Sequence, residues 1–253
     1  MKSEKELLKE IEALIAQKFK DNPEELKRLK EESKKMASEK EHERRTALIE
    51  DATKMLFEEV MFEKTDVEKV KAFIKAGADV NSIESEYQAT PLHFAMAKND
   101  VNLVKALVEA GANINFQNSQ RTAPIHTGIY NDSLESIKFL IESGADVNLF
   151  QMDGFSSLHC AVIRNNFELV KILVNGGADV NIFDINATYQ GSALHWAATL
   201  SNTEIAEFLI ESGANVNAKN KFDNTPMNWA MKNGNRKMLE MFERNGGISG
   251  VNF

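Results

Sequence analysis

The chain has 253 residues, of which 43% are hydrophobic and 27% charged, and its formal net charge is −8. This length is enough for one or two domains with an apolar core. The acidic balance argues against sequence-independent binding to nucleic acids, because such binding needs clustered Lys and Arg. The single cysteine, Cys160, excludes a disulfide within the chain and a cysteine-based zinc site.

The first 45 residues contain no glycine and one proline, Pro23. Their charges interrupt every apolar run, so we expect neither a secretory signal nor membrane insertion, and a cytoplasmic location. One helical face is apolar and consists of Leu7, Leu8, Ile11, Leu14, Ile15 and Phe19. There are three alternatives for what packs against this face: the neighbouring repeat, a second copy of the chain in a homodimer, or another molecule.

The remainder of the chain repeats three sequence patterns every 33 to 36 residues. One is Gly-Ala-Asp/Asn-Val/Ile-Asn, which begins at Gly77, Gly111, Gly144, Gly177 and Gly213, with a degenerate copy at Gly246. The second resembles Thr-Pro-Leu-His and begins at Thr90, Ala123, Ser156, Ser192 and Thr225. In the third, apolar residues precede each glycine at helical spacing, as in Leu103, Val104, Leu107 and Val108.

These patterns predict two short helices and a turn in each repeat. Thr or Ser caps the first helix, and Pro is tolerated at the following position because its missing N–H has no partner there. Small residues one turn later, such as Ala161 and Ala197, permit close packing. The apolar stripe predicts the second helix, and the glycine ends it in a left-handed conformation.

This unit resembles the ankyrin repeat. The resemblance implies an all-α solenoid of helix-turn-helix units with β-hairpin loops, in residues 46–253, behind a charged helical N-terminal arm in 1–45. An N-terminal cap is expected in 46–81, a C-terminal cap in 217–253, and full repeats in 82–114, 115–147, 148–180 and 181–216. In the C-terminal cap, Asn228 replaces the recurring histidine and Glu243 interrupts the stripe, and we expect both to face water.

Four of the five histidines recur with the repeat: His93, His126, His159 and His195. Equivalent positions in stacked units lie too far apart to share one metal ion, and the resemblance implies that each imidazole binds a turn and ties adjacent loops. Cys160 is expected to be buried and unreactive. We identify no catalytic residue, cofactor or metal, and expect no enzyme. Trp196 and Trp229 are expected in the core.

The resemblance implies a concave face built from hairpin tips and the exposed ends of the first helices. The middle and later repeats place mostly apolar and aromatic residues there, as the core of a protein interface requires. The candidate partner-binding residues are Tyr130, Met152, Phe155, Ile163, Arg164, Ile185, Tyr189, Leu200 and Phe222. The sequence therefore favours a non-enzymatic protein-binding module. The alternatives are a scaffold that self-associates through its arm, and a microbial effector delivered into a host cytoplasm.

Overall fold

The computed structural model describes residues 9–10, 13–14, 17, 41–185 and 190–249. The predicted apolar face of the N-terminal arm lies almost entirely outside these residues. From residue 41 onward the described chain is helical, and its helices are α3 (Glu41–Met61), α4 (Val67–Lys75), α5 (Pro91–Ala97), α6 (Val101–Glu109), α7 (Pro124–Tyr130), α8 (Leu134–Glu142), α9 (Ser157–Ile163), α10 (Phe167–Asn175), α11 (Ala193–Thr199), α12 (Thr203–Glu211), α13 (Pro226–Asn233) and α14 (Arg236–Arg244).

The chain forms two compact units. The first contains the described residues up to Ala95 together with Asp100–Asn113. In it α3 packs on α4 and α4 on α6, and the Phe57 and Phe94 rings meet edge to face at 5.9 Å. Helix α3 begins at Glu41 and so runs across the boundary at residue 46 that was expected between arm and cap.

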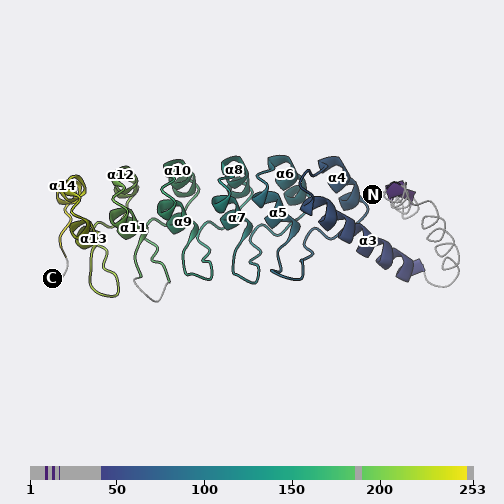
Figure 1. Cartoon of the computed structure of the whole chain (residues 1–253), viewed down its shortest axis with the longest axis horizontal. Coiled ribbons are helices and arrows are strands. Elements are labelled where there is room, and N and C mark those ends of the chain that lie inside the picture. The colour runs from purple at the N-terminus through teal and green to yellow at the C-terminus, as the bar shows by residue number, and fades with distance from the viewer. Residues whose placement is uncertain (1–8, 11–12, 15–16, 18–40, 186–189, 250–253) are drawn as a thin grey trace. The chain divides into compact units, whose positions relative to one another are not determined.

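The second unit contains Met96–Asn99 and the described residues from Ile114 onward. Its helices form successive pairs, each joined to the next by a hairpin loop. The first helices α7, α9, α11 and α13 pack in sequence order, and the hairpins project on the side away from the second helices α8, α10, α12 and α14 (Figure 1). Among the described residues the hairpins contain only isolated β-bridges, Phe150 to Ser156 and Phe183 to Ser192, so the all-α class is confirmed.

Helix ends follow the predicted local chemistry. Pro91, Pro124 and Pro226 each occupy the first position of a helix. At the start of α9, Ser156 is the N-cap residue, and its N–H donates to Nδ1 of His159. The glycine that follows α10, Gly177, has φ of +91°, a conformation that a side chain would strain.

The apolar stripe of each second helix contributes fully buried side chains to the core. In α10, Leu169, Val170 and Leu173 are fully buried, and the small residues of the first helices allow close contact. At Gly128 in α7, a Cβ would collide with the end of the Met96 side chain and lie 3.1 Å from Ile137. The predicted packing role of these small residues is therefore confirmed.

An asparagine in each turn connects neighbouring repeats. In the second unit, Asn181 accepts the Asn215 N–H at 2.7 Å and donates from Nδ2 to the Gly213 carbonyl at 3.1 Å. Asn217 makes the corresponding pair of bonds with Ile248 and Gly246. Hydrogen bonds between these asparagine side chains and main-chain atoms of the next turn therefore join neighbouring repeats, in addition to apolar packing.

The expectation that Asn228 faces water is wrong. Its side chain is buried, and Oδ1 accepts hydrogen bonds from the Thr225 N–H at 2.8 Å and the Thr225 hydroxyl at 3.0 Å. The Thr225 hydroxyl has a single proton, and the Ile248 carbonyl, 2.8 Å away, is a second acceptor for it. The segment after α14 therefore covers this position, whereas Glu243 is exposed as expected.

Candidate functional site

Large apolar side chains are exposed on one side of the second unit. They occur on the hairpins, at the C-terminal ends of first helices and after α14, and none lies on the second helices α8, α10, α12 or α14. This set consists of Tyr130, Met152, Ile163, Ile185, Leu200, Phe222, Met231 and Ile248. Met152 is 67% exposed and Phe222 is 55% exposed, so these side chains do not contribute to the core. We call Tyr130, Met152, Ile163, Ile185, Leu200 and Phe222 the hairpin-side surface.

Six predicted partner-binding residues thus belong to the hairpin-side surface, and three do not. Tyr189 lies outside the described residues. Phe155 is half-buried, and its ring meets that of Trp196 edge to face at 5.2 Å, so it fixes its hairpin to the next repeat. Arg164 is exposed but makes an ion pair with Asp132 at 3.1 Å, and its guanidinium lies 6.0 Å from the centre of the Tyr130 ring.

The hairpins hold one another through main-chain hydrogen bonds. The Met152 N–H donates to the Gln120 carbonyl at 3.3 Å, and the Ile185 N–H donates to the Gly154 carbonyl at 2.9 Å. Two of the most exposed residues therefore stand on backbone that is fixed by the preceding hairpin. A surface with a fixed backbone loses less conformational entropy when it binds than a mobile loop does.

The recurring histidines connect each first helix to the following hairpin. The imidazole Nε2 of His126, His159 and His195 donates to the carbonyl oxygens of Leu149, Gly191 and Asn224, at 3.1, 3.1 and 3.0 Å. Burial lowers the pKa of His159 and of His195 to about 4, so both are neutral at pH 7. Among the described residues, no three His, Cys, Asp or Glu side chains are grouped as metal ligands would be.

Cys160 lies on α9 beneath the Tyr130 side chain. Its thiol accepts a hydrogen bond from Nε2 of Gln151 at 2.9 Å, and the same amide nitrogen donates to the Tyr130 hydroxyl at 3.1 Å. Burial raises the pKa of Cys160 to about 12. The thiolate that a nucleophile requires is therefore almost absent at neutral pH, as the sequence indicated.

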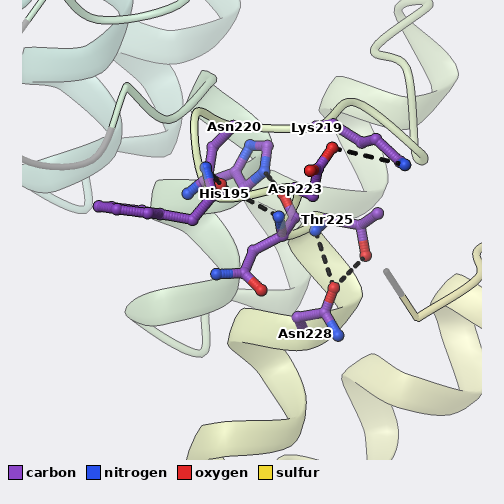
Figure 2. A network of polar contacts seen from close by, with 8 residues as sticks. His195, Lys219, Asn220, Asp223, Thr225 and Asn228 are labelled. Carbon is purple, nitrogen blue, oxygen red and sulfur yellow. Dashed lines mark hydrogen bonds and ion pairs between the residues drawn. The ribbon is translucent and has the colours of Figure 1, made fainter. Parts of the chain in front are cut away.

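Trp196 and Trp229 are half-buried instead of fully enclosed in the core. Both line a pocket of about 310 Å³ between α11, α13 and the last hairpin, with Thr199, Asn220, Phe222, Asn224, Asn228, Lys232 and Asn233. The expectation that both lie in the core was wrong because the first-helix residue that follows the histidine position lines this pocket and is only partly enclosed. Figure 2 shows His195, Asn220 and Asn228 together in this region.

Sequence reasoning also missed a recurring polar position in the hairpins. Five residues before the cap of a first helix, or more where the loop is longer, stands a side chain with a carbonyl or carboxylate oxygen: Glu84, Asn118, Gln151, Asp184 and Asn220. Asn118 and Asn220 each accept two N–H groups of their own hairpin. Asp184 is buried and accepts the Gly191 N–H and Trp196 Nε1–H at 2.8 and 2.9 Å. Alignment of the repeats on their caps would have revealed this position.

The comparison with known families agrees with this geometry. A model of ankyrin repeats, three copies, matches residues 56–151, 121–184 and 158–248. The chain therefore belongs to the ankyrin-repeat family, as its motifs suggested. A search of the curated proteins found no match.

Ankyrin repeats are generally protein–protein interaction modules, and the family is typically non-enzymatic. Among the residues that the structure describes, no helix combines the length and the low polarity needed to cross a lipid bilayer.

Proposed function

We propose that the chain is a non-enzymatic binding module whose hairpin-side surface docks a protein partner. The observation that supports this most is the one-sided distribution of exposed apolar side chains in the second unit. The second helices α8, α10, α12 and α14 expose no large apolar residue. Chance exposure of surface hydrophobics would place them on both sides.

The chemistry of the surface suits a protein interface. Tyr130 and Phe222 offer aromatic area, and Met152 is an adaptable apolar side chain. Burial of each such anchor typically contributes on the order of 1–3 kcal/mol to association. Arg164, which is held beside Tyr130 by Asp132, adds a charged group at the rim.

The test compares two variants with an equal change of charge. Met152→Asp/Ile185→Asp alters the hairpin-side surface, and Asn175→Asp/Thr203→Asp alters the second helices α10 and α12. Each full-length protein is immobilised and exposed to extract of the source cells, and bound proteins are identified by mass spectrometry. Phe155 is left unchanged, because its contact with Trp196 would confound folding with binding.

We expect a defined set of proteins to be retained by the wild type and the second-helix variant but lost from the hairpin variant. Both variants should keep the wild-type melting temperature, because Met152, Ile185 and Asn175 are exposed and the half-buried Thr203 lies at the start of α12, where an acidic residue is tolerated. If the hairpin variant retains every partner, this surface does not bind them and the proposal is wrong.

A further inference from the structure

The pocket beside Trp196 and Trp229 has the walls of an aromatic-binding site. Its volume of about 310 Å³ lies at the lower end of the range for ligand pockets, which suits one aromatic side chain. The two indoles meet edge to face at 5.7 Å with an interplanar angle of 88°. The Phe222 ring, which is 55% exposed, forms a further wall. An inserted ring would find both faces and edges of aromatic partners, the arrangements that aromatic pairs prefer.

These walls are held in place before any ligand arrives. Asp184 fixes the Trp196 indole through its Nε1–H, and the Gly191 N–H binds the same carboxylate oxygen. Gly191 also permits the close approach of Trp229, because a Cβ there would lie 3.1 Å from Cη2 of that indole. A pocket with fixed walls requires little reorganisation when an occupant enters.

Asn220 provides an unused hydrogen-bond donor at this pocket. Its side chain is only 6% exposed, and its Oδ1 accepts the N–H groups of Phe222 and Asn224 at 2.9 and 3.1 Å. Its Nδ2 has no hydrogen-bond partner within the described part of the chain. A buried donor without a partner is costly, so a ligand oxygen that reaches Nδ2 would be bound favourably.

The charges at the rim favour an acidic occupant. Lys232 lines the pocket, and the Lys221 ammonium lies 5.0 Å from the centre of the Phe222 ring. The exposed carboxylate of Asp223 forms an ion pair with Lys219, whose Nζ lies 3.6 Å from Oδ1, as Figure 2 shows. Lys219, Lys221 and Lys232 therefore line the hollows, and the carboxylates beside them are Asp223, which pairs with Lys219, and Asp184, which is buried and accepts two N–H groups. A carboxylate would gain electrostatic attraction at this rim.

A second hollow lies beside the first and indicates an elongated occupant. It has a volume of about 400 Å³, and its lining includes Ile185, Lys219, Lys221 and Asn220. Asn220 is thus common to both hollows. One aromatic side chain fills the first hollow alone, whereas an extended peptide could cover both and place successive residues in them.

We propose that these two hollows bind an extended peptide segment of a partner protein that has an aromatic residue next to an acidic one. The aromatic ring enters between Trp196, Trp229 and Phe222, an oxygen of the peptide accepts from Asn220 Nδ2, and the carboxylate faces Lys221 and Lys232. This inference rests on the proposed function and specifies the chemistry of its partner.

The two tryptophans of the chain both line the pocket, so the intrinsic fluorescence of the full-length protein reports on it directly. The probe is a blocked heptapeptide with Phe between two Glu residues and Gly/Ser flanks. Matched probes replace Phe with Ala or both Glu with Gln. Free 3-phenylpropionate is the third control and distinguishes a peptide site from a site for small aromatic acids.

Two variants test the recognition without removing the walls. Asn220→Asp keeps an oxygen for the two hairpin N–H groups but removes the Nδ2 donor and adds a negative charge; one repeat earlier, Asp184 already accepts a hairpin N–H from Gly191. Lys221→Glu/Lys232→Glu reverses two exposed charges. Lys138→Glu/Lys237→Glu reverses two charges on α8 and α14 and is the matched control.

We expect a saturable fluorescence change with the Phe/Glu peptide, and affinity weaker by at least about tenfold in either pocket variant. The control variant should bind like the wild type, and both altered peptides should bind more weakly. No saturable response, equal binding by Asn220→Asp, or binding of 3-phenylpropionate as tight as that of the peptide would overturn the inference. If partners are still lost from Met152→Asp/Ile185→Asp in that case, the proposed function stands without it.

Discussion

His195, in the first helix of one repeat, donates a hydrogen bond from Nε2 to the main-chain oxygen of Asn224 in the next hairpin, 3.0 Å away. Its Nδ1 accepts the Ser192 N–H at 3.1 Å. The imidazole is therefore neutral, with its proton on Nε2, because a proton on Nδ1 would oppose the Ser192 N–H. One side chain thus both caps α11 and joins two repeats, and it does so only in its neutral form.

This requirement makes the stability of the fold depend on pH. Burial lowers the pKa of His159 and His195 to about 4, whereas an unfolded histidine titrates near 6.5. Between these values the unfolded chain binds more protons, so the free energy of unfolding falls as the pH decreases from about 6.5 toward 4. The loss amounts to about 3 kcal/mol per histidine once both pKa values are passed. Urea denaturation at pH 7.5, 6.0, 5.0 and 4.5 measures it.

The control for this prediction is the double variant His159→Asn/His195→Asn. Asn228 shows that asparagine can fill the cap role of this position, because its Oδ1 accepts from Thr225. The variant should be less stable at pH 7.5, since the bonds to Gly191 and Asn224 are lost, but its stability should fall less between pH 7.5 and 5. An unchanged dependence on pH would show that other groups cause the effect.

The turn asparagines should contribute stability through their bonds between repeats. Asn181→Ala removes the acceptor of the Asn215 N–H and the donor to the Gly213 carbonyl. Because the site is exposed, water can replace part of both bonds, and we expect a loss of about 1–2 kcal/mol by urea denaturation. Asn175→Ala, at the exposed end of α10, is the matched control and should leave stability nearly unchanged. Similar values for the two variants would contradict the prediction.

The sequence alone predicted the features that recur in every repeat. Cap residues, Pro at the first helical position, the buried stripe and the terminating glycine depend on interactions within one unit, so their spacing alone reveals them. The contact of His159 with the following hairpin was expected only through the resemblance to ankyrin repeats. Its geometry depends on how units stack, which the periodicity does not specify.

The candidate surface was predicted less completely, for a physical reason. Exposure at Met152, Ile185 and Phe222 follows from their position at hairpin tips, which the pattern reveals. Phe155 stands in the same hairpin as Met152 but packs on Trp196, and this depends on a residue one repeat away. Asn228 is buried because the segment after α14 covers it, and no local pattern encodes that contact.

The glycine that ends each second helix should be required for its backbone conformation alone. Gly177 has φ of +91°, and no atom lies within 4 Å of the position that a Cβ would occupy. Gly177→Ala should therefore lower the free energy of unfolding by about 1–2 kcal/mol through backbone strain, without a steric clash. Gly128→Ala is the contrasting variant.

Gly128 is helical, and alanine stands at the equivalent position of other repeats, such as Ala161. The added methyl group would displace the end of the flexible Met96 side chain, while the helix gains about 1 kcal/mol of intrinsic propensity. We expect a net change within about 1 kcal/mol by urea denaturation. A larger loss at Gly128 than at Gly177 would show that packing, and not backbone conformation, determines where glycine is needed.

The folded chain should resist alkylation at Cys160. Burial raises the pKa of this thiol from 9.0 to about 12, which lowers the thiolate fraction at pH 8 by about three orders of magnitude, and the side chain is nearly inaccessible. Iodoacetamide should label the protein completely in concentrated guanidinium and only very slowly in buffer, as measured by intact mass. Asn175→Cys adds an exposed thiol on α10 and should take up one label rapidly while Cys160 stays unmodified. If Cys160 reacts in the folded protein as fast as the introduced thiol, the buried network with Gln151 and Tyr130 is open to solvent and a reactive role for this cysteine becomes the better interpretation.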